Sequence, residues 1–348
     1  MGFNPDFLSM NKANTPLKAL LAIESSCDET SASVCVEGKI LSNIISSQLE
    51  HGEYGGVIPE LASRLHQQQI VRVVKKALEE ADLKASELDA IAFTRGPGLL
   101  GALIVGTCFA KAYALGLDVP LVDVNHMHAH VLANFLTDNP PSFPFLCLTV
   151  SGGHTQIVLV KDHLDMEIIG QTIDDAAGEA FDKAAKLLGL PYPGGPEVDK
   201  LAKTGDSSAF SFPIPQIGTF EFSFSGIKTS LLYLLKRELK NDPEFIVKRK
   251  ADLAASYQQT IVTILLKKLA VAAKRYDVKH LAIAGGVSAN SELRRRFQAL
   301  CDEEGWEAHI PPFEYCTDNA AMIAITGYYK MKAGKFADQK VAPFTRIK

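Results

Sequence analysis

The hydrophobic positions of this chain fall into short apolar runs and into longer stretches with helical spacing. Residues 58–83 follow the helical spacing, which predicts an amphipathic helix whose apolar face carries Leu61, Leu65, Val73, Ala77 and Leu78. A second helix is expected to begin at Leu99. Apolar runs of strand length lie at residues 17–23, 33–36, 90–93 and 121–124 and, after a proline-rich segment, at residues 145–150, 156–160 and 281–284.

Two local arrangements occur once in each half of the sequence. A strand, a polar turn and a returning strand are expected around residues 24–30 and again around residues 151–155. A strand, a glycine turn and a helix are expected around residues 95–98 and again around residues 285–290. The order is duplicated without sequence identity, which predicts an α/β fold of two lobes with similar topology and a central cleft.

The length of the chain fits this two-lobed organisation. At 348 residues it is long enough for about two domains. A disordered tail is expected at residues 1–17, an N-terminal α/β lobe at 18–138 and a linker at 139–144. A C-terminal α/β lobe should follow at 145–320. A C-terminal helix and tail at 321–348 should return to the first lobe.

Charge is distributed unevenly along the sequence. The net charge of −4 predicts no strong general attraction to nucleic acid or to an anionic membrane. Residues 228–296, however, carry fifteen Lys and Arg against six Asp and Glu, a local charge of +9. This stretch suits a localised anionic partner or a set of amphipathic helices with solvated basic faces. On charge alone, the solvated faces are the better interpretation.

Cysteine spacing and the N-terminal sequence indicate the compartment. None of the six cysteines forms a C-x-x-C pair, so the sequence predicts neither a disulfide framework nor a thiolate zinc site, and a reducing compartment fits. The first eighteen residues lack the apolar core of a signal peptide. The most membrane-like stretch, residues 99–117, is interrupted by Lys111 and is expected to be a buried helix. We therefore expect a cytoplasmic protein without a membrane segment.

Three histidines within five residues are the first candidate for chemistry. If the helix begins near His126, then His126 and His130 share one face and can both present a ring nitrogen to one ion, while His128 points elsewhere. Imidazole suits Zn, Fe, Ni or Cu. Asp318 is the best candidate for a third ligand, with Thr317 as the cap of the helix that follows. The alternatives are a pair of core or surface histidines and a first-turn aspartate favoured by the helix dipole.

Two glycine-rich turns are candidates for anion binding. Residues 151–155, Ser-Gly-Gly-His-Thr, lie between two expected strands, where backbone N–H groups and hydroxyls can approach an anion. Residues 285–290, Gly-Gly-Val-Ser-Ala-Asn, open a helix whose N-terminus attracts phosphate, and Asn290 could bond a base or ribose edge. The alternatives are an ordinary hairpin turn and helix capping by Ser288.

An acidic segment follows the first of these turns. Asp175, Glu179 and Asp182 are expected on one helical face, where they repel one another unless something engages them. Ribose hydroxyls or a magnesium ion would do so. Residues 192–196, Tyr-Pro-Gly-Gly-Pro, are expected to form a rigid turn, and Asp199 follows it.

Taken together and in order, eight segments resemble the bacterial TsaD family, the tRNA N6-adenosine threonylcarbamoyltransferases, once described as O-sialoglycoprotein endopeptidases. The resemblance runs from about Leu20 to Tyr329. Ser25 stands where many members have Thr, and the N-terminal tail is extra. The segments are Ile-Glu-Ser-Ser-Cys-Asp-Glu-Thr from Ile23, Gly-Gly-Val-Ile-Pro-Glu from Gly55, Arg-Gly-Pro-Gly from Arg95, His-Met-His-Ala-His from His126, Ser-Gly-Gly-His-Thr from Ser151, Gly-Glu-Ala-Phe-Asp-Lys from Gly178, Ala-Gly-Gly-Val-Ser-Ala-Asn from Ala284 and Cys-Thr-Asp-Asn-Ala-Ala-Met from Cys316.

The resemblance implies an actin/sugar-kinase-like (ASKHA) fold and a metal-dependent acyltransferase that modifies tRNA. The implied reaction moves the threonylcarbamoyl group from L-threonylcarbamoyladenylate to the N6 amine of the adenosine beside the anticodon, in tRNAs reading ANN codons, and releases AMP. One divalent ion, Fe²⁺ or Zn²⁺, is implied on His126, His130 and Asp318, and Mg²⁺ could accompany the nucleotide. TsaB and TsaE are the implied partner proteins. The implied substrate site comprises Thr149, Val150, Ser151, Gly152, Gly153, Asp182, Gly195, Asp199 and Asn290.

The acceptor amine is a poor nucleophile, so the implied reaction needs an activated carbonyl. A metal ion can orient the threonylcarbamoyl group and offset its developing charge, and glycine turns that hold the adenylate make AMP a stabilised leaving group. The basic stretch at residues 228–296 then becomes a candidate tRNA surface. No general base is identifiable from the sequence, and Asp28 and Glu29 are the candidates, with substrate positioning or a structural turn as alternatives.

Two functions of other classes compete with this one. A metalloprotease would explain the histidines, but a zincin needs H-E-x-x-H, and Met127, His128 and Ala129 supply no acid between the outer histidines. A scaffold that senses ATP through an actin-like cleft would explain the glycine turns, but it would not need the candidate metal ligands.

Overall fold

The computed structural model describes residues 18–346, so the expected disordered tail at residues 1–17 lies outside the described residues. The described chain forms two compact units. Unit 1 comprises the described residues up to Gln48, Pro59–Ala129 and those from Asn319 onward, and unit 2 comprises Leu49–Ile58 and His130–Asp318. The C-terminal helix α9 (Ala320–Lys332) thus belongs to the unit that contains the first strands.

Unit 1 is built on a mixed five-stranded sheet. Its strands, in the order β3-β2-β1-β4-β5 across the sheet, pair antiparallel on the β3 side of β1 and parallel on the β5 side. All six residues of β1 are buried, as expected for a central strand that is covered on both faces. The strands are β1 (Ala19–Glu24), β2 (Glu29–Val36), β3 (Lys39–Ser47), β4 (Ala90–Gly96) and β5 (Leu121–Asn125).

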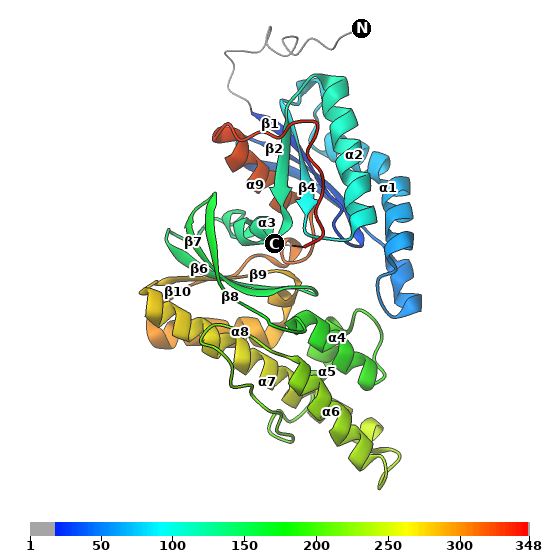
Figure 1. The fold of residues 1–348 in the computed structure, drawn as a ribbon, viewed down its shortest axis with the longest axis vertical. Helices are drawn as coiled ribbons and strands as arrows, with labels where there is room; N and C mark the ends of the chain where they lie inside the picture. The colour runs from blue at the N-terminus through cyan, green and yellow to red at the C-terminus, as the bar shows by residue number, and fades with distance from the viewer. Residues whose placement is uncertain (1–17, 347–348) are drawn as a thin grey trace. The chain divides into compact units, whose positions relative to one another are not determined.

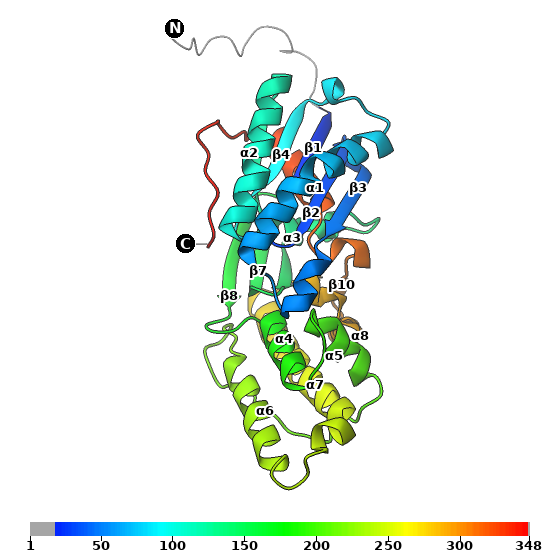
Figure 2. The ribbon, with the colours of Figure 1, turned by 90° about the vertical axis from the view of Figure 1, so that its right-hand side faces the viewer.

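Three helices cover this sheet (Figures 1 and 2). Helices α1 (Pro59–Glu80) and α2 (Leu100–Leu117) pack side by side on one face, and α9 packs across the strands on the other. Close packing of α9 requires Gly327, because a Cβ atom there would lie 2.8 Å from the Cβ of Ala92 on β4. The buried face of α1 includes Ala62, His66 and Ile70, so the predicted face is wrong at Leu61 and Leu65, which are only half-buried.

Unit 2 repeats the strand order of unit 1. Its sheet runs β8-β7-β6-β9-β10, again with three antiparallel strands followed by two parallel ones. The repeat confirms the prediction of two α/β lobes with similar topology, although β3 and β8 had no counterpart among the predicted elements. The strands are β6 (Phe145–Val150), β7 (Thr155–Asp162), β8 (Asp165–Gln171), β9 (His280–Ala284) and β10 (Glu307–His309).

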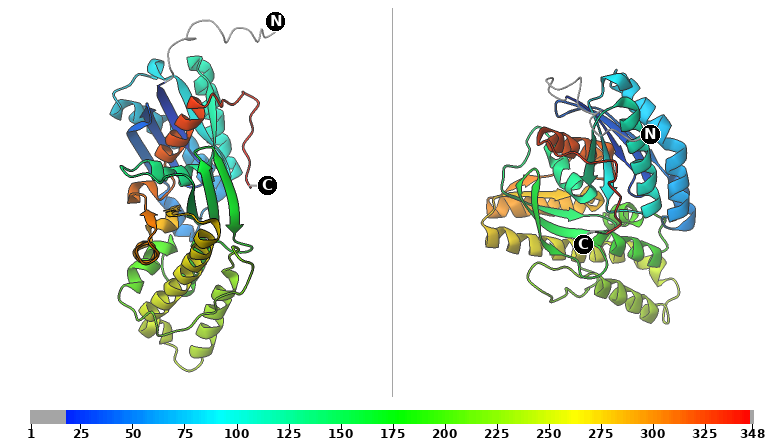
Figure 3. Two further views of the ribbon diagram at one scale, coloured as in Figure 1. Left: turned by 90° about the vertical axis from the view of Figure 1, so that its left-hand side faces the viewer. Right: turned by 45° about the horizontal axis from the view of Figure 1, so that its top comes forward.

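Helices again form the core of unit 2 against its sheet (Figure 3). The larger core lies under α4 (Ala177–Leu187), α5 (Gly194–Ala202), α6 (Ser225–Glu238), α7 (Phe245–Tyr276) and α8 (Ser291–Glu304). The other face of the sheet is covered by a smaller cluster in which Val131 of α3 (His126–Leu132) and Phe135 meet Phe145 and Val158. Short 3₁₀ helices lie at Leu49–Tyr54, Ala85–Glu87, Ala133–Phe135, Gly286–Ala289 and Phe313–Tyr315.

Helix α2 differs from the buried helix that its composition predicts. One face is buried on the sheet, whereas Leu100, Ile104 and Leu115 are exposed. Among the described residues α2 alone is long and apolar enough to cross a membrane. That is weak evidence for a span, since a helix that packs on the core of a soluble protein meets the same two criteria.

The six thiols should differ sharply in reactivity because burial raises the pKa of three of them, Cys35, Cys147 and Cys301, to about 12. Cys316 is also buried, whereas Cys108 is exposed and Cys27 half-buried. Only the thiolate reacts with a disulfide reagent. We expect titration of the native chain at pH 8 to detect two thiols, at Cys27 and Cys108, and titration in urea to detect all six. Fast reaction of Cys147 in the native chain would contradict this.

Candidate functional site

Helix α3 positions the two outer histidines. The side chain of Asn125 accepts hydrogen bonds from the backbone N–H groups of Met127 (2.9 Å) and His128 (3.2 Å), which satisfies the first turn and makes the helix begin at His126. His126 and His130 are therefore one turn apart on one face, and both are buried. His128 lies outside their cluster, and burial together with the charge of Lys330 lowers its pKa.

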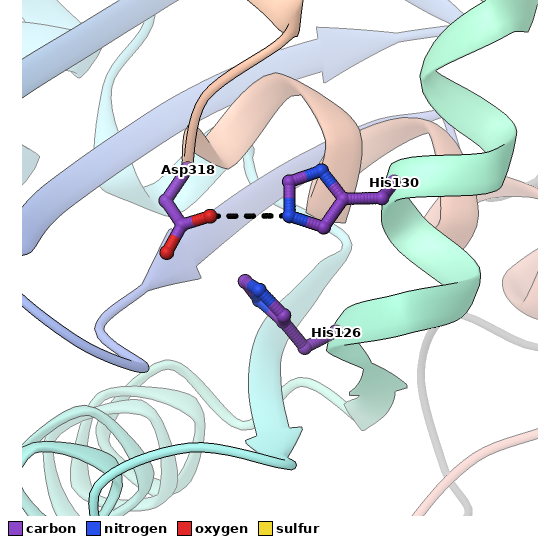
Figure 4. Close-up of side chains that lie close together, drawn as sticks. All are labelled: His126, His130 and Asp318. Atoms are coloured by element: carbon purple, nitrogen blue, oxygen red, sulfur yellow. Dashed lines mark hydrogen bonds and ion pairs between the residues drawn. The ribbon is translucent and has the colours of Figure 1, made fainter. Parts of the chain in front are cut away.

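Asp318 completes a cluster with these two histidines (Figure 4). Its Oδ1 lies 3.1 Å from Nε2 of His130, and the three candidate ligand atoms all lie within 4.8 Å of one another. Asp318 directly precedes Asn319, whose side chain caps α9 by accepting the N–H of Met322 (3.0 Å). The predicted capping role of Thr317 is therefore wrong, because Asn319, directly before α9, is the residue whose side-chain oxygen reaches the first turn of the helix.

A buried carboxylate behind His126 orients its ring. Glu24, at the end of β1, is fully buried, and its Oε2 lies 3.2 Å from Nδ1 of His126. The hydroxyl of Ser26 lies 3.2 Å from the same nitrogen. With Nδ1 facing Glu24 and Ser26, the Nε2 atom of His126 lies on the opposite side of the ring. Sequence reasoning missed Glu24, although a glutamate that ends an otherwise apolar strand was the available signal.

These residues fit a divalent metal. Two imidazoles and one carboxylate form a donor set suited to a first-row transition metal with open positions. A histidine ligand usually donates its second ring N–H to a carboxylate or carbonyl group, which fixes the tautomer, and Glu24 is placed to do this for His126. The assignment of the three ligands stays a prediction.

The turn between β1 and β2 is held by unusually close contacts. A Cβ atom on Gly98 would lie 2.5 Å from the carbonyl oxygen of Ser26, so only glycine allows this approach. The hydroxyl of Ser25 donates to the carbonyl oxygen of Ala102 on α2 (3.2 Å). From the other side, buried His66 bonds Thr30 Oγ1 (2.7 Å) and the carbonyl oxygen of Cys27 (2.9 Å). His66 was also missed, because a lone histidine in a helical pattern carries no chemical signal.

The candidate base Asp28 lies in the same turn and Glu29 directly after it, and both are outside the histidine cluster. The carbonyl oxygen of Asp28 accepts the N–H of Gln48 (3.1 Å). Glu29 is the first residue of β2 and pairs with Ser47 of β3, so the strand begins earlier than the predicted polar turn allows. Neither side chain belongs to the group formed by His126, His130 and Asp318.

The predicted turn at residues 151–155 connects β6 to β7. Gly152 and Gly153 are exposed, and a Cβ atom on either would meet nothing within 4 Å, so their backbone is open to a ligand. The hydroxyl of Thr155 accepts the N–H of Ala177 (2.9 Å) and so helps to start α4. Thr149 and Val150, at the end of β6, are buried.

The second glycine turn contacts the first. Gly285 has φ +85°, and a Cβ atom there would lie 2.5 Å from the carbonyl oxygen of Val150, so this position also requires glycine. Asn290, not Ser288, caps α8 by accepting the N–H of Leu293 (2.9 Å), and its amide donates to Gln258 (2.7 Å). The carboxylate of Asp199 accepts from the Ser291 hydroxyl (2.8 Å) and therefore lies beside Asn290.

A lysine bridges two carboxylates of the acidic segment. Lys183 lies 2.8 Å from both the Asp175 and the Glu179 carboxylates, so repulsion between them needs no magnesium ion. The predicted helical face is wrong at Asp175, which precedes the start of α4. The carboxylate of Asp182 accepts the N–H of Gly194 (2.9 Å). Gly194 and Gly195 form the first turn of α5 rather than the rigid turn predicted.

Removing the charge of Glu24 should weaken metal binding without unfolding the chain. In the Glu24→Gln variant we expect the affinity for Zn²⁺ to fall about 10–100-fold, the range found when an outer partner of a ligand is lost. Competition against a chromophoric chelator measures this. Glu60→Gln, on the exposed side of α1, is the control. A Glu24→Gln variant that is folded and binds Zn²⁺ as the control does would rule out the orienting role.

Comparison with known proteins identifies the family. A model of the family described as TsaD, tRNA N6-adenosine threonylcarbamoyltransferase, matches residues 39–325. A protein of that description from Porphyromonas gingivalis is 58% identical over 333 residues, which cover 94% of this chain and 98% of the relative. One from Christiangramia forsetii is 57% identical over 335 residues, covering 94% and 98%.

Solved structures at low identity support the fold. HypF from T. kodakarensis superposes with a TM-score of 0.63 at 16% identity, over 91% of this chain and 48% of HypF. The (R)-2-hydroxyglutaryl-CoA dehydratase component A of Acidaminococcus fermentans superposes with a TM-score of 0.54 at 16% identity, over 90% and 99%. Both have the predicted actin/sugar-kinase-like fold. On the family model and the relatives, the chain belongs to the TsaD family of tRNA N6-adenosine threonylcarbamoyltransferases.

Proposed function

We propose that this transferase moves the threonylcarbamoyl group of L-threonylcarbamoyladenylate to the N6 amine of the adenosine beside the anticodon, in tRNAs that read ANN codons, and releases AMP. The observation that carries the proposal is 58% identity, over 98% of its length, to a relative described as performing threonylcarbamoyl transfer to tRNA adenosine. The cluster of the buried His126 and His130 with the partly exposed Asp318 supplies the kind of site that this chemistry needs.

The proposed metal site consists of the two α3 histidines and Asp318. It would hold one divalent ion, Fe²⁺ or Zn²⁺. When bound, the ion would supply Lewis-acid polarisation of an oxygen of the threonylcarbamoyl group. Glu24 and Ser26 hold the His126 ring, and Asp318 lies against His130. These contacts position the ligands before the substrate arrives.

The adenylate is proposed to lie on the turns of unit 2. Supporting residues are the open backbone at Gly152 and Gly153 and the two carboxylates that bond helix N-termini, Asp182 at α5 and Asp199 at α8. Backbone N–H groups directed at the phosphate would stabilise AMP as it leaves. Thr149, Val150, Ser151, Gly195 and Asn290 complete the proposed set, and Mg²⁺ could accompany the nucleotide.

The acceptor amine must lose a proton as the new bond to the carbonyl carbon forms. Asp28 and Glu29 are the proposed candidates for the base. Both lie in or directly after the turn that contains Ser26, and Ser26 touches His126. A base in this turn would be close to the candidate metal ligands, which is where the reacting carbonyl would be held.

The surface that we propose to bind tRNA includes exposed basic side chains near the end of α6, among them Lys236, Arg237 and Lys240. Some basic side chains of this stretch are paired within the chain, Arg249 with Asp252 and Lys274 with Glu304 among them. Because the net charge of the whole chain is −4, the chain presents a modest overall field to an RNA backbone. We therefore propose that partner proteins, TsaB and TsaE, complete the tRNA surface, and that the protein works in the cytoplasm.

Loss of a candidate ligand should abolish both metal binding and transfer. We expect His126→Ala and Asp318→Ala to lose stoichiometric metal and at least about a hundred-fold in transfer rate, since the charge developing on the carbonyl would be left uncompensated. The assay supplies threonylcarbamoyladenylate, tRNA and the partner proteins, and mass spectrometry of nucleosides detects the product. His163→Ala, another histidine beside an acid, is the control. Full activity in a metal-free His126→Ala variant would exclude a role for the metal in transfer.

The same preparations discriminate the competing functions. Cleavage of casein by the wild-type chain that His126→Ala abolishes would favour a protease. Restoration of tRNA modification in depleted cells by a transfer-dead variant would favour a scaffold. We expect neither result.

Reversing charge at the end of α6 should affect tRNA alone. A Lys236→Glu, Lys240→Glu variant is expected to raise KM for tRNA several-fold, and less so at high salt, because phosphate contacts are salt-dependent. Steady-state kinetics with each substrate varied separately measures this, and KM for the adenylate should not change. Lys335→Glu, on an exposed residue of unit 1, is the control. An unchanged KM for tRNA would exclude this surface.

A further inference from the structure

A second group of potential ligands lies at the edge of the sheet of unit 2. Strands β9 and β10 pair in parallel, and their register places Glu307 opposite His280. His309 follows Glu307 by two residues, so both point to the same face of the sheet. Three potential ligands from β9 and the edge strand β10 therefore share one face of the sheet.

The distances between these side chains suit a metal ion. Nδ1 of His280 lies 3.2 Å from Nε2 of His309 and 3.4 Å from a carboxylate oxygen of Glu307, and all three candidate atoms lie within 4.8 Å of one another. A tetrahedral ion with bonds of about 2.0–2.2 Å has ligand atoms roughly 3.3–3.5 Å apart. The existing separations already approach that spacing.

The tautomer of His309 is set for coordination. Its Nδ1 lies 3.2 Å from the backbone carbonyl oxygen of Asn139, which can only accept, so the ring proton resides on Nδ1 and the Nε2 lone pair faces His280 and Glu307. Metal-binding histidines commonly have such a carbonyl partner.

The three side chains differ in solvent exposure, which leaves a path for a metal ion to exchange with solvent. His309 is buried, the His280 side chain is 23% exposed, and the Glu307 side chain is 63% exposed. An ion could therefore enter from solvent on the Glu307 side, where water could occupy a fourth position. When no ion is bound, a hydrogen bond from His280 Nδ1–H to the Nε2 lone pair of His309 accounts for their contact.

We propose that His280, Glu307 and His309 form a second binding site for a divalent transition metal, of which Zn²⁺ is the best fit to two imidazoles and a carboxylate. The site shares no residue with the cluster of His126, His130 and Asp318. An ion there would link the three-residue strand β10 to β9 and, through His309, to the segment that contains Asn139. Such an ion would help to hold the short edge strand in place.

The test counts zinc ions in a chain whose first cluster has been removed. A His126→Ala, Asp318→Ala variant, stripped with chelator and titrated with Zn²⁺ against a chromophoric competitor, should bind one ion per chain. Adding His280→Gln or Glu307→Gln should weaken this binding about ten-fold or more. Adding His163→Gln, the matched control with a histidine beside Asp162, should leave it unchanged. Absence of zinc from the double variant, or equal binding by all four chains, would overturn the proposal.

Two readouts keep the result independent of folding and of transfer activity. Glu307 is on the surface, so adding Glu307→Gln to the His126→Ala, Asp318→Ala variant should keep the melting temperature of the metal-free chain. Only the rise in that temperature on adding Zn²⁺ should become smaller. Long-range ¹H–¹⁵N spectra should show Nδ1 of His309 protonated and its Nε2 resonance moved by Zn²⁺. A His309 resonance that Zn²⁺ does not move would also overturn the proposal.

Discussion

The buried carboxylate of Glu24 is the constraint on which the candidate metal centre depends. It accepts hydrogen bonds from the Ser26 N–H (2.5 Å) and the Thr94 hydroxyl (2.5 Å), and it meets the His126 ring. Burying a charge without such partners is strongly unfavourable. The buried carboxylate therefore requires these three contacts. Together they join β1, β4 and α3 and fix the ring of one candidate ligand.

The same construction recurs in the two units and explains their glycines. In each sheet the first strand turns back sharply, and the parallel neighbour on its other side ends in a glycine turn next to it. A Cβ atom added to Gly98 would lie 2.5 Å from the Ser26 carbonyl oxygen in unit 1, and one added to Gly285 would lie 2.5 Å from the Val150 carbonyl oxygen in unit 2. Parallel pairing brings both loops to one end of the sheet, where no larger side chain fits between them.

Several charged groups in this chain are paired with other parts of the chain. Lys183 bridges two carboxylates of the acidic segment, and salt bridges engage six of the fifteen basic side chains at residues 228–296. Such pairing fixes side chains in place and reduces the long-range field available to steer an anionic partner. It therefore gives a physical reason why a substrate as large as tRNA would need additional surfaces.

The sequence by itself determined the fold class, the family, most of the strands and the two histidines of α3, because hydrophobic period and i, i+4 spacing are local properties. The sequence did not specify the helix caps and helix starts near residues 175, 194, 290 and 319, since neighbouring polar residues compete for the same N–H groups. The sequence also named Asp318 as the candidate third ligand, and the structure places its carboxylate against His130. Only the tertiary structure decided that Glu24 orients the His126 ring, that His66 supports the first turn and that His280 and His309 meet. These contacts join residues far apart in sequence, and no local pattern encodes them.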